Sequence, residues 1–128
     1  MFLASCSKPN MAPPLIEVTD PWIRKPIPPL DKTAGYFKVT NHSETPIVLK
    51  VAQSKSARKI EFHETLEEEG MMRMRRLKEV VVAPGETVSF EPGGKHLMVF
   101  GFIAGDSPVS VQLRIGEDQI LEVPFDLR

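Results

Sequence analysis

The chain has 128 residues, and its 16 Lys and Arg against 17 Asp and Glu give a formal net charge of −1. This length suits one domain, and 41% hydrophobic with 26% charged residues is typical of a folded chain rather than a disordered one. The near-neutral charge, with scattered basic residues, indicates no nucleic-acid partner, and a single cysteine excludes a disulfide framework and a cysteine-rich zinc site.

The chain begins with a segment that is typical of a bacterial lipoprotein. Leu3-Ala4-Ser5-Cys6 resembles a lipobox, in which small residues precede a cysteine that takes the lipid and becomes the mature N-terminus. Only five residues precede Cys6, so the match is to the end of a secretory signal, which usually has ~15–30 residues. Residues 7–14 contain three prolines and predict an extended tether. We therefore expect residues 1–14 to hold a signal remnant, a lipidated Cys6 and this tether; the alternative is an unmodified thiol in a frayed terminus.

Membrane contact is expected only through a lipid on Cys6, because no run approaches the ~18 apolar residues of a spanning helix. A lipid anchor of this kind implies export. We therefore expect an extracytoplasmic location, in the periplasm or at the outer cell surface.

Short alternating segments, punctuated by turn residues, predict one all-β domain over residues 15–128. Turns are expected at 41–43, 83–86, 92–94 and 116–118, where Gly and Pro are frequent. The acidic stretch 64–69 is interpreted as either a loop or a helical turn. A Greek-key β-sandwich or barrel is the expected fold class. The expected strands are residues 16–19, 34–41, 47–54, 59–65, 72–75, 80–82, 87–91, 97–102, 109–115 and 119–124.

Enzyme motifs are incomplete in this sequence. His63-Glu64 begins like a zinc-protease motif, but Glu67 stands where the second histidine is required. A G-x-S-x-G nucleophile elbow is absent. We expect no enzymatic activity.

One pattern of histidines and methionines is complete: His63, Met74, His96 and Met98 form H-x10-M-x21-H-x-M. His96 and Met98 are two residues apart on an expected strand, so both side chains leave the same face. His63 alternates with apolar residues on its own strand and therefore points away from the apolar face. The alternative for each residue taken singly is ordinary packing.

Two thioethers and two imidazoles form a soft, uncharged donor set that suits Cu(I). Calcium and magnesium prefer oxygen ligands, zinc rarely takes a thioether, and a blue-copper site needs a cysteine thiolate. The pattern thus predicts that copper is carried without redox use. Met71 and Met72 are interpreted as packing or loop residues, with Met72 a candidate additional sulfur, and His42 in a turn is not expected to be a ligand.

The same four residues resemble the signature of the PCuAC family of periplasmic Cu(I) chaperones, H(M)-x10-M-x21-H-x-M. The resemblance extends over residues 21–123. It implies a cupredoxin-like β-barrel with one Cu(I) at an exposed site. It also implies delivery to the binuclear copper centre of cytochrome c oxidase subunit II, often alongside Sco-type proteins. The matching segments include Pro21-Trp22, Ala34-Gly35-Tyr36-Phe37, Phe62-His63-Glu64-Thr65, Val82-Ala83-Pro84-Gly85 and Pro92-Gly93-Gly94-Lys95-His96-Leu97-Met98.

The chain departs from the family pattern in two places. After Gly101 it runs through Phe102-Ile103-Ala104 straight into Gly105-Asp106, where the family usually has a longer apolar and basic loop. This difference leaves the choice of partner open. The sequence ends at Arg128 without the Met- and His-rich tail of some relatives, so one copper per chain is expected.

Three functions are compatible with the sequence. The first is a metallochaperone that surrenders Cu(I) by ligand exchange, and the second is a copper-buffering or resistance protein without a dedicated oxidase acceptor. The third is a β-sandwich interaction lipoprotein in which the His and Met pattern is accidental. Charged residues flank Met74, and they either orient a partner or serve solubility. They are Glu67, Glu68, Glu69, Arg73, Arg75 and Arg76.

Overall fold

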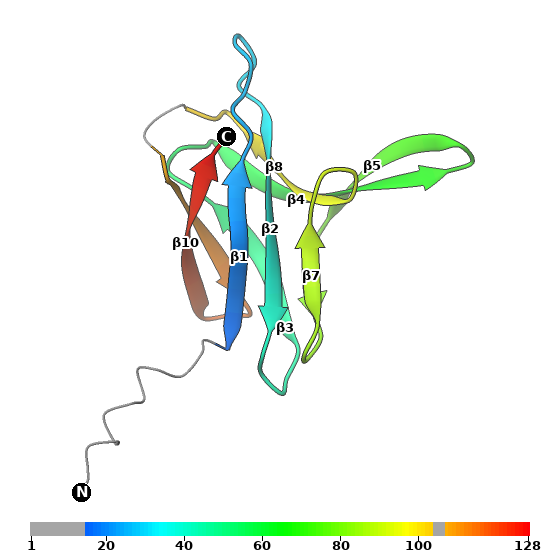
Figure 1. Ribbon diagram of the computed structural model, residues 1–128, viewed down its shortest axis with the longest axis vertical. Helices are drawn as coiled ribbons and strands as arrows, with labels where there is room; N and C mark the ends of the chain where they lie inside the picture. The colour runs from blue at the N-terminus through cyan, green and yellow to red at the C-terminus, as the bar shows by residue number, and fades with distance from the viewer. Residues whose placement is uncertain (1–14, 104–106) are drawn as a thin grey trace, which may run out of the picture.

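A computed structural model describes residues 15–103 and 107–128, which form ten β-strands and contain no helix (Figure 1). Within this part of the chain there is accordingly no helix of the length and apolarity that a membrane span requires. Cys6 and the expected tether lie outside the described residues. The strands are β1 (Ile16–Ile23), β2 (Thr33–Asn41), β3 (Ile47–Gln53), β4 (Lys59–Glu68), β5 (Met71–Leu77), β6 (Val80–Val82), β7 (Thr87–Phe90), β8 (Lys95–Phe100), β9 (Val109–Ile115) and β10 (Gln119–Leu127).

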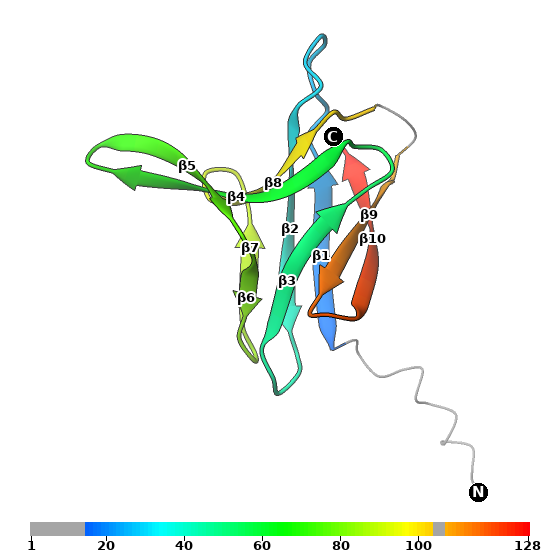
Figure 2. The same ribbon diagram turned by 180° about the vertical axis from the view of Figure 1, so that it is seen from behind.

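The ten strands form one sheet in the order β5-β4-β8-β7-β2-β1-β10-β9-β3-β6. A further pairing, Ala52 with Ile60, joins β3 to β4 and closes the sheet into a barrel (Figure 2). The β1–β10 and β7–β8 pairs are parallel, and the other pairs are antiparallel. The expected single all-β domain is confirmed.

Inward side chains from β2, β7 and β10 pack together in the core of the barrel. Phe37 stacks on Phe90 with ring centroids 4.4 Å apart and meets the edge of Phe125 at 5.7 Å. Phe37 and Phe125 are 1% and 0% exposed. Burying a side chain of this size stabilises a fold by about 1.5–3 kcal/mol, so this cluster holds the three strands together.

Asn41 fixes the turn that the sequence predicted at 41–43. Its buried Nδ2 donates to the carbonyl oxygens of Thr45 and Val82, at 2.8 and 3.0 Å, and its Oδ1 accepts from the Ser43 backbone N–H at 2.9 Å. A buried amide without partners would be costly, so these bonds specify how β2 lies against β6.

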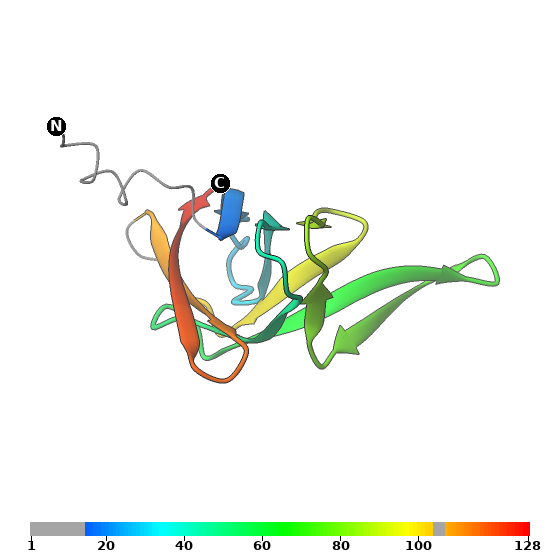
Figure 3. The ribbon, with the colours of Figure 1, turned by 90° about the horizontal axis from the view of Figure 1, so that it is seen from below.

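All ten expected strands are present, and the largest error concerns the stretch 64–69. Both interpretations of it were wrong, because β4 continues to Glu68 and only Glu69-Gly70 turn, with φ of 54° and 79°. The prediction that Met71 and Met72 are packing or loop residues was also wrong, since both lie on strand β5 and are 60% and 65% exposed. β4 and β5 here form a hairpin arm that projects from the barrel (Figure 3), so neither face shows apolar alternation.

Two glycines have a left-handed backbone conformation, but only one of them also lacks space for a Cβ atom. Gly85 has φ of +75° and open space where a Cβ would stand, whereas at Gly101, φ +65°, a Cβ would lie 2.7 Å from the Cβ of Arg58. We expect Gly85→Ala to lower the free energy of unfolding by about 1–2 kcal/mol, and Gly101→Ala by about 2–4 kcal/mol. Urea denaturation of the metal-free protein measures both. Equal losses would contradict the close packing of Arg58 against the end of β8.

Candidate metal centre

Strand register places both histidines of the motif side by side. His63 on β4 is directly opposite His96 on β8, and their ring centroids are 5.8 Å apart. Directly opposite residues of an antiparallel pair share one face of the sheet, and residues two apart on a strand do so as well. Met98, two residues after His96 and opposite Glu61, therefore lies on the same face.

This shared face is the outside of the barrel. Phe62 and Leu97, the strand neighbours of the two histidines, pair with each other and are 4% and 0% exposed in the core. His63 and His96 alternate with them and therefore point outward, as the sequence pattern predicted for His63. The Phe100 ring, 6.3 Å from that of His63, helps to cover the imidazoles.

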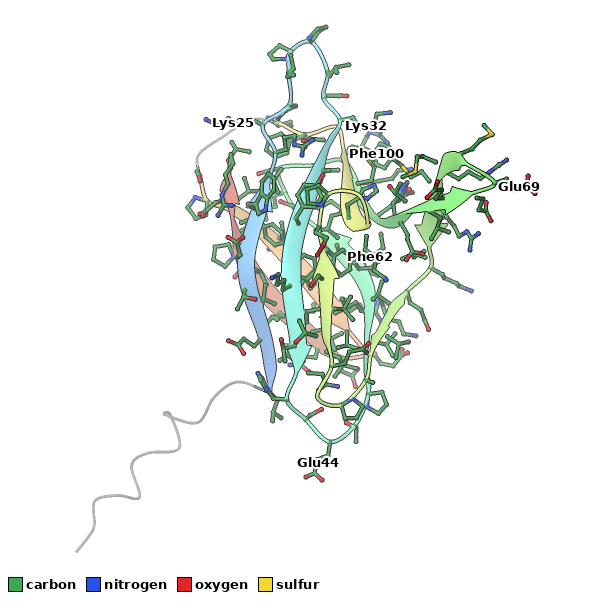
Figure 4. All side chains as sticks on the ribbon, turned by 45° about the vertical axis from the view of Figure 1, so that its right-hand side comes forward. Lys25, Lys32, Glu44, Phe62, Glu69 and Phe100 are labelled. Atoms are coloured by element: carbon green, nitrogen blue, oxygen red, sulfur yellow. The ribbon has the colours of Figure 1, made fainter. Side chains whose placement is uncertain are left out.

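Met74 reaches the same face from the other side of β4. It is opposite Thr65, two residues beyond His63, and its side chain is 56% exposed on the arm. Met74 and Met98 are thus diagonal neighbours of His63 on the two flanking strands, at backbone separations of about 7–8 Å. Met72 lies on this face too, but it is opposite Glu67 and nearer the tip, where Figure 4 shows Glu69.

Glu61 determines which nitrogen of His63 is free. The Nε2 of His63 is 2.9 Å from the Oε1 of Glu61, and this bond is the main reason that the pKa of Glu61 is lowered. A carboxylate only accepts, so Nε2–H donates, and in the neutral ring Nδ1 then carries the lone pair. Nδ1 is buried and has no hydrogen-bond partner among the described residues. Because unpaired buried polar atoms are rare, this nitrogen is a good candidate for a metal ligand.

His96 is held by a backbone carbonyl through its other ring nitrogen, Nδ1, whereas His63 is held through Nε2. Its Nδ1 donates to the Gly94 carbonyl oxygen at 3.2 Å, and the same oxygen accepts from the Thr65 backbone N–H at 3.1 Å. The Nε2 of His96 therefore carries the lone pair in the neutral ring. Burial lowers the pKa of His96, outweighing the hydrogen bond to Gly94, and the nearby His63 lowers it further. The neutral, ligating form is thus favoured.

The uncommitted donors around the two imidazoles are nitrogen and sulfur, because the Glu61 carboxylate on this face is already paired with His63, Lys59 and Arg76. Within residues 15–103 and 107–128, no three His, Cys, Asp or Glu side chains gather closely enough to hold an ion. A metal on this face would therefore need the thioethers as well as the imidazoles, a combination that suits Cu(I). His42 is separate from this face, since its Nε2 bonds the Glu17 carboxylate at 2.7 Å on the surface.

Two supporting residues were missed in the sequence. Glu61 precedes His63 by two positions, so strand alternation already places both on one face and was a usable signal. The carbonyl of Gly94 left no such signal, because its position depends on how the 92–94 turn folds against β4. Ligating histidines commonly bond a carboxylate or a carbonyl through the other nitrogen, as both do here.

Comparisons with known proteins identify the class of fold first. The structure matches the copper-bound PCuAC domain from PmoF2 with a TM-score of 0.75 at 19% identity, over 91% of this chain and 94% of that one. It matches apo-DR1885 from Deinococcus radiodurans with a TM-score of 0.68 at 22% identity, over 89% and 78% of the two chains. The fold is that of PCuAC domains.

A known sequence family also matches most of the chain. The chain belongs to the family described as "Putative lipoprotein LpqE-like", which matches residues 16–123. It is 27% identical over 118 residues to "Putative lipoprotein Lxx21020" of Leifsonia xyli subsp. xyli, covering 89% of this chain and 70% of that protein.

Long-range ¹H–¹⁵N NMR of the metal-free protein tests the geometry of His96. We expect its hydrogen on Nδ1, because the Gly94 carbonyl can only accept. Its titration midpoint should lie below the ordinary imidazole value of about 6.5, since burial disfavours the charged ring. The urea-unfolded protein is the control and should titrate at the ordinary value. A hydrogen on Nε2, or an unshifted midpoint, would contradict this hydrogen bond and this burial.

Proposed function

We propose that this protein is an extracytoplasmic metallochaperone that carries one Cu(I) ion on His63, Met74, His96 and Met98. The observation that carries the proposal is the pair of outward imidazoles, each with one nitrogen hydrogen-bonded and the other free, flanked by two thioethers. The likeness to a domain described as copper-bound supports copper as the cargo. The family's description as lipoproteins supports a lipid on Cys6.

The donor set fits a carrier of Cu(I) because neutral imidazoles and thioethers bind a metal ion without first being deprotonated. Thioethers do not protonate, so protons compete only at the two imidazoles. Burial lowers the pKa of His96 and so favours its neutral form, and the hydrogen bond from Nε2 of His63 to Glu61 leaves Nδ1 of the neutral ring free to bind the ion. Neutral ligands would also leave the Cu(I) complex with a single positive charge.

Unequal exposure of the ligands gives an order for release. Met74 is 56% exposed on the arm, whereas His96 is 5% exposed and bonded to the backbone. An incoming donor can therefore displace Met74 first while the imidazoles still hold the ion. The acceptors in this proposal are the copper domain of cytochrome c oxidase subunit II and Sco-type copper proteins.

Copper titration against a colorimetric Cu(I) competitor tests the ligand set. Wild type should bind one equivalent, and His96→Ala or Met98→Ala should lose most of the bound copper. Met74→Ala should weaken the affinity by about tenfold or more, by analogy with the loss of groups around other metal sites. Met71→Ala is the matched control, because it removes a similarly exposed methionine from the opposite face of β5. Equal affinities of Met71→Ala and Met74→Ala would remove Met74 from the set.

A copper-buffering or resistance protein is the second candidate, and the burial of His96 favours it because a buried ligand slows release. Mixing the Cu(I)-loaded protein with an apo oxidase copper domain separates the two, with absorption spectra following the acceptor. A chaperone should transfer its copper within minutes and faster than the same concentration of a Cu(I)–glutathione complex. Retention of the copper over hours, with the acceptor still competent toward Cu(I)–glutathione, would contradict the chaperone and favour the buffer.

A further inference from the structure

A positively charged groove lies on the outer face of the barrel where β3 and β4 cross. It has a volume of about 570 Å³, and four cationic side chains line it against one carboxylate, that of Glu61. We call it the basic groove, and its cations are Lys55, Arg58, Lys59 and Arg76. All four side chains belong to exposed residues. The whole chain has a net charge of −1, so this positive charge is a local feature.

The strand crossing and a well-bonded loop build the groove. β3 and β4 pair only at Ala52 with Ile60, so their outer faces diverge and leave a hollow. The loop between them is held by Ser54, whose Oγ donates to the Ser110 carbonyl at 2.6 Å. Arg58 is held by its backbone N–H, which lies 2.9 Å from the carbonyl oxygen of Phe100. The cations therefore stand on a defined backbone.

Most of the positive charge in the groove is uncompensated. Lys59 and Arg76 share the single carboxylate of Glu61, at 3.2 and 3.6 Å. Lys55 and Arg58 form no ion pair within 4 Å with any residue of 15–103 or 107–128. Glu122 is near enough to Lys55 for this ammonium to add to the hydrogen bonds from Ser110 and Gln112 that lower the pKa of its carboxyl. A concave surface with an excess of one sign of charge attracts molecules of the opposite charge and raises the rate at which they associate with it.

The basic groove opens directly beside the candidate metal centre. Glu61 lines the groove and also bonds His63, while Arg76 is the β5 residue directly opposite His63. Both residues lie on the outer face that carries the four proposed ligands. A molecule seated in the groove would thus be adjacent to a bound ion without occupying a ligand position.

We propose that the basic groove docks an acidic, extended segment of the protein that accepts the copper, an assignment of partner that rests on the proposed function. Charge complementarity favours such a segment, and the side-chain amide of Gln53 adds hydrogen-bonding groups for its backbone. A second copy of this chain fits less well. Its projecting tip, residues 67–75, sets Arg73 and Arg75 against Glu67, Glu68 and Glu69, and Glu68 lies 3.4 Å from Arg73 and 3.7 Å from Arg75. The tip therefore offers less net negative charge than an uninterrupted run of carboxylates.

Binding of a fluorescein-labelled octaglutamate peptide, followed by anisotropy, tests the groove without copper. The metal-free full chain should bind this peptide in a salt-sensitive manner and should not bind octaglutamine. Lys55→Glu/Arg58→Glu should weaken binding at least about tenfold, because like charges then face the peptide. Lys25→Glu/Lys38→Glu, with the same change of charge outside the groove, is the matched control and should bind as wild type does. Lys55→Ala/Arg58→Ala repeats the test with a smaller expected loss, should the reversal variant fail to fold.

Other outcomes would overturn the proposal. Equal loss in the two reversal variants would mean that only net charge matters. Binding to phosphatidylglycerol vesicles but not to the peptide would assign the groove to a membrane, and self-association abolished by the groove variant would assign it to a second copy.

His96→Ala should lose copper yet keep the peptide, and the groove variant should keep its Cu(I) affinity while transferring copper about tenfold more slowly. A failure of transfer in every variant therefore counts against the proposed function, whereas a failure of peptide binding counts against the groove.

Discussion

The backbone register between β4 and β8 is the constraint on which the candidate site depends. It pairs Phe62 with Leu97 in the core and, one position along, His63 with His96 on the outside. A slip of β4 by one residue would expose Phe62 and bury His63 while β8 kept its own faces, so the core enforces the register. The hydrophobic interior thereby places two polar rings from distant parts of the chain next to each other. No attraction between the imidazoles is needed to bring them together.

β4 serves two structures at once, and this division explains why the four proposed ligands differ in exposure. Its first half belongs to the barrel, where Ile60 and Phe62 are 9% and 4% exposed, and its second half forms the arm with β5. Few apolar groups are buried along the arm, since every residue of β5 before Leu77 is exposed. Segments with few buried contacts open at a lower free energy than the core. The sulfur of Met74 thus stands on the less stable element, whereas His96 and Met98 stand on the more stable one.

The sequence predicted the barrel strands well, because each strand with a buried face alternates apolar and polar side chains. It failed on the arm, where Glu64 to Glu68 and the Met and Arg residues of β5 have no buried face to produce such a pattern. The spacing of histidine and methionine selected residues that the register then placed on one face. The groups that orient the imidazoles were harder to find. The Gly94 carbonyl is positioned by a turn, and strand alternation puts Glu61 on the face of His63 without showing that the two side chains bond.

The separation of the basic groove from the ligand set has a physical reason. Imidazoles and thioethers are neutral, so a centre built from them would carry only the single charge of Cu(I), which is a weak and undirected attraction for a partner. Recognition must then come from charged groups that do not bind the metal. Lys55 and Arg58 fit that requirement because they are exposed and lie across Glu61 from His63. With the charge beside the proposed ligands rather than among them, the proposed acceptor could dock through its own carboxylates while its donor atoms approach the exposed Met74 side. The affinity for the ion and the affinity for the partner can therefore change independently.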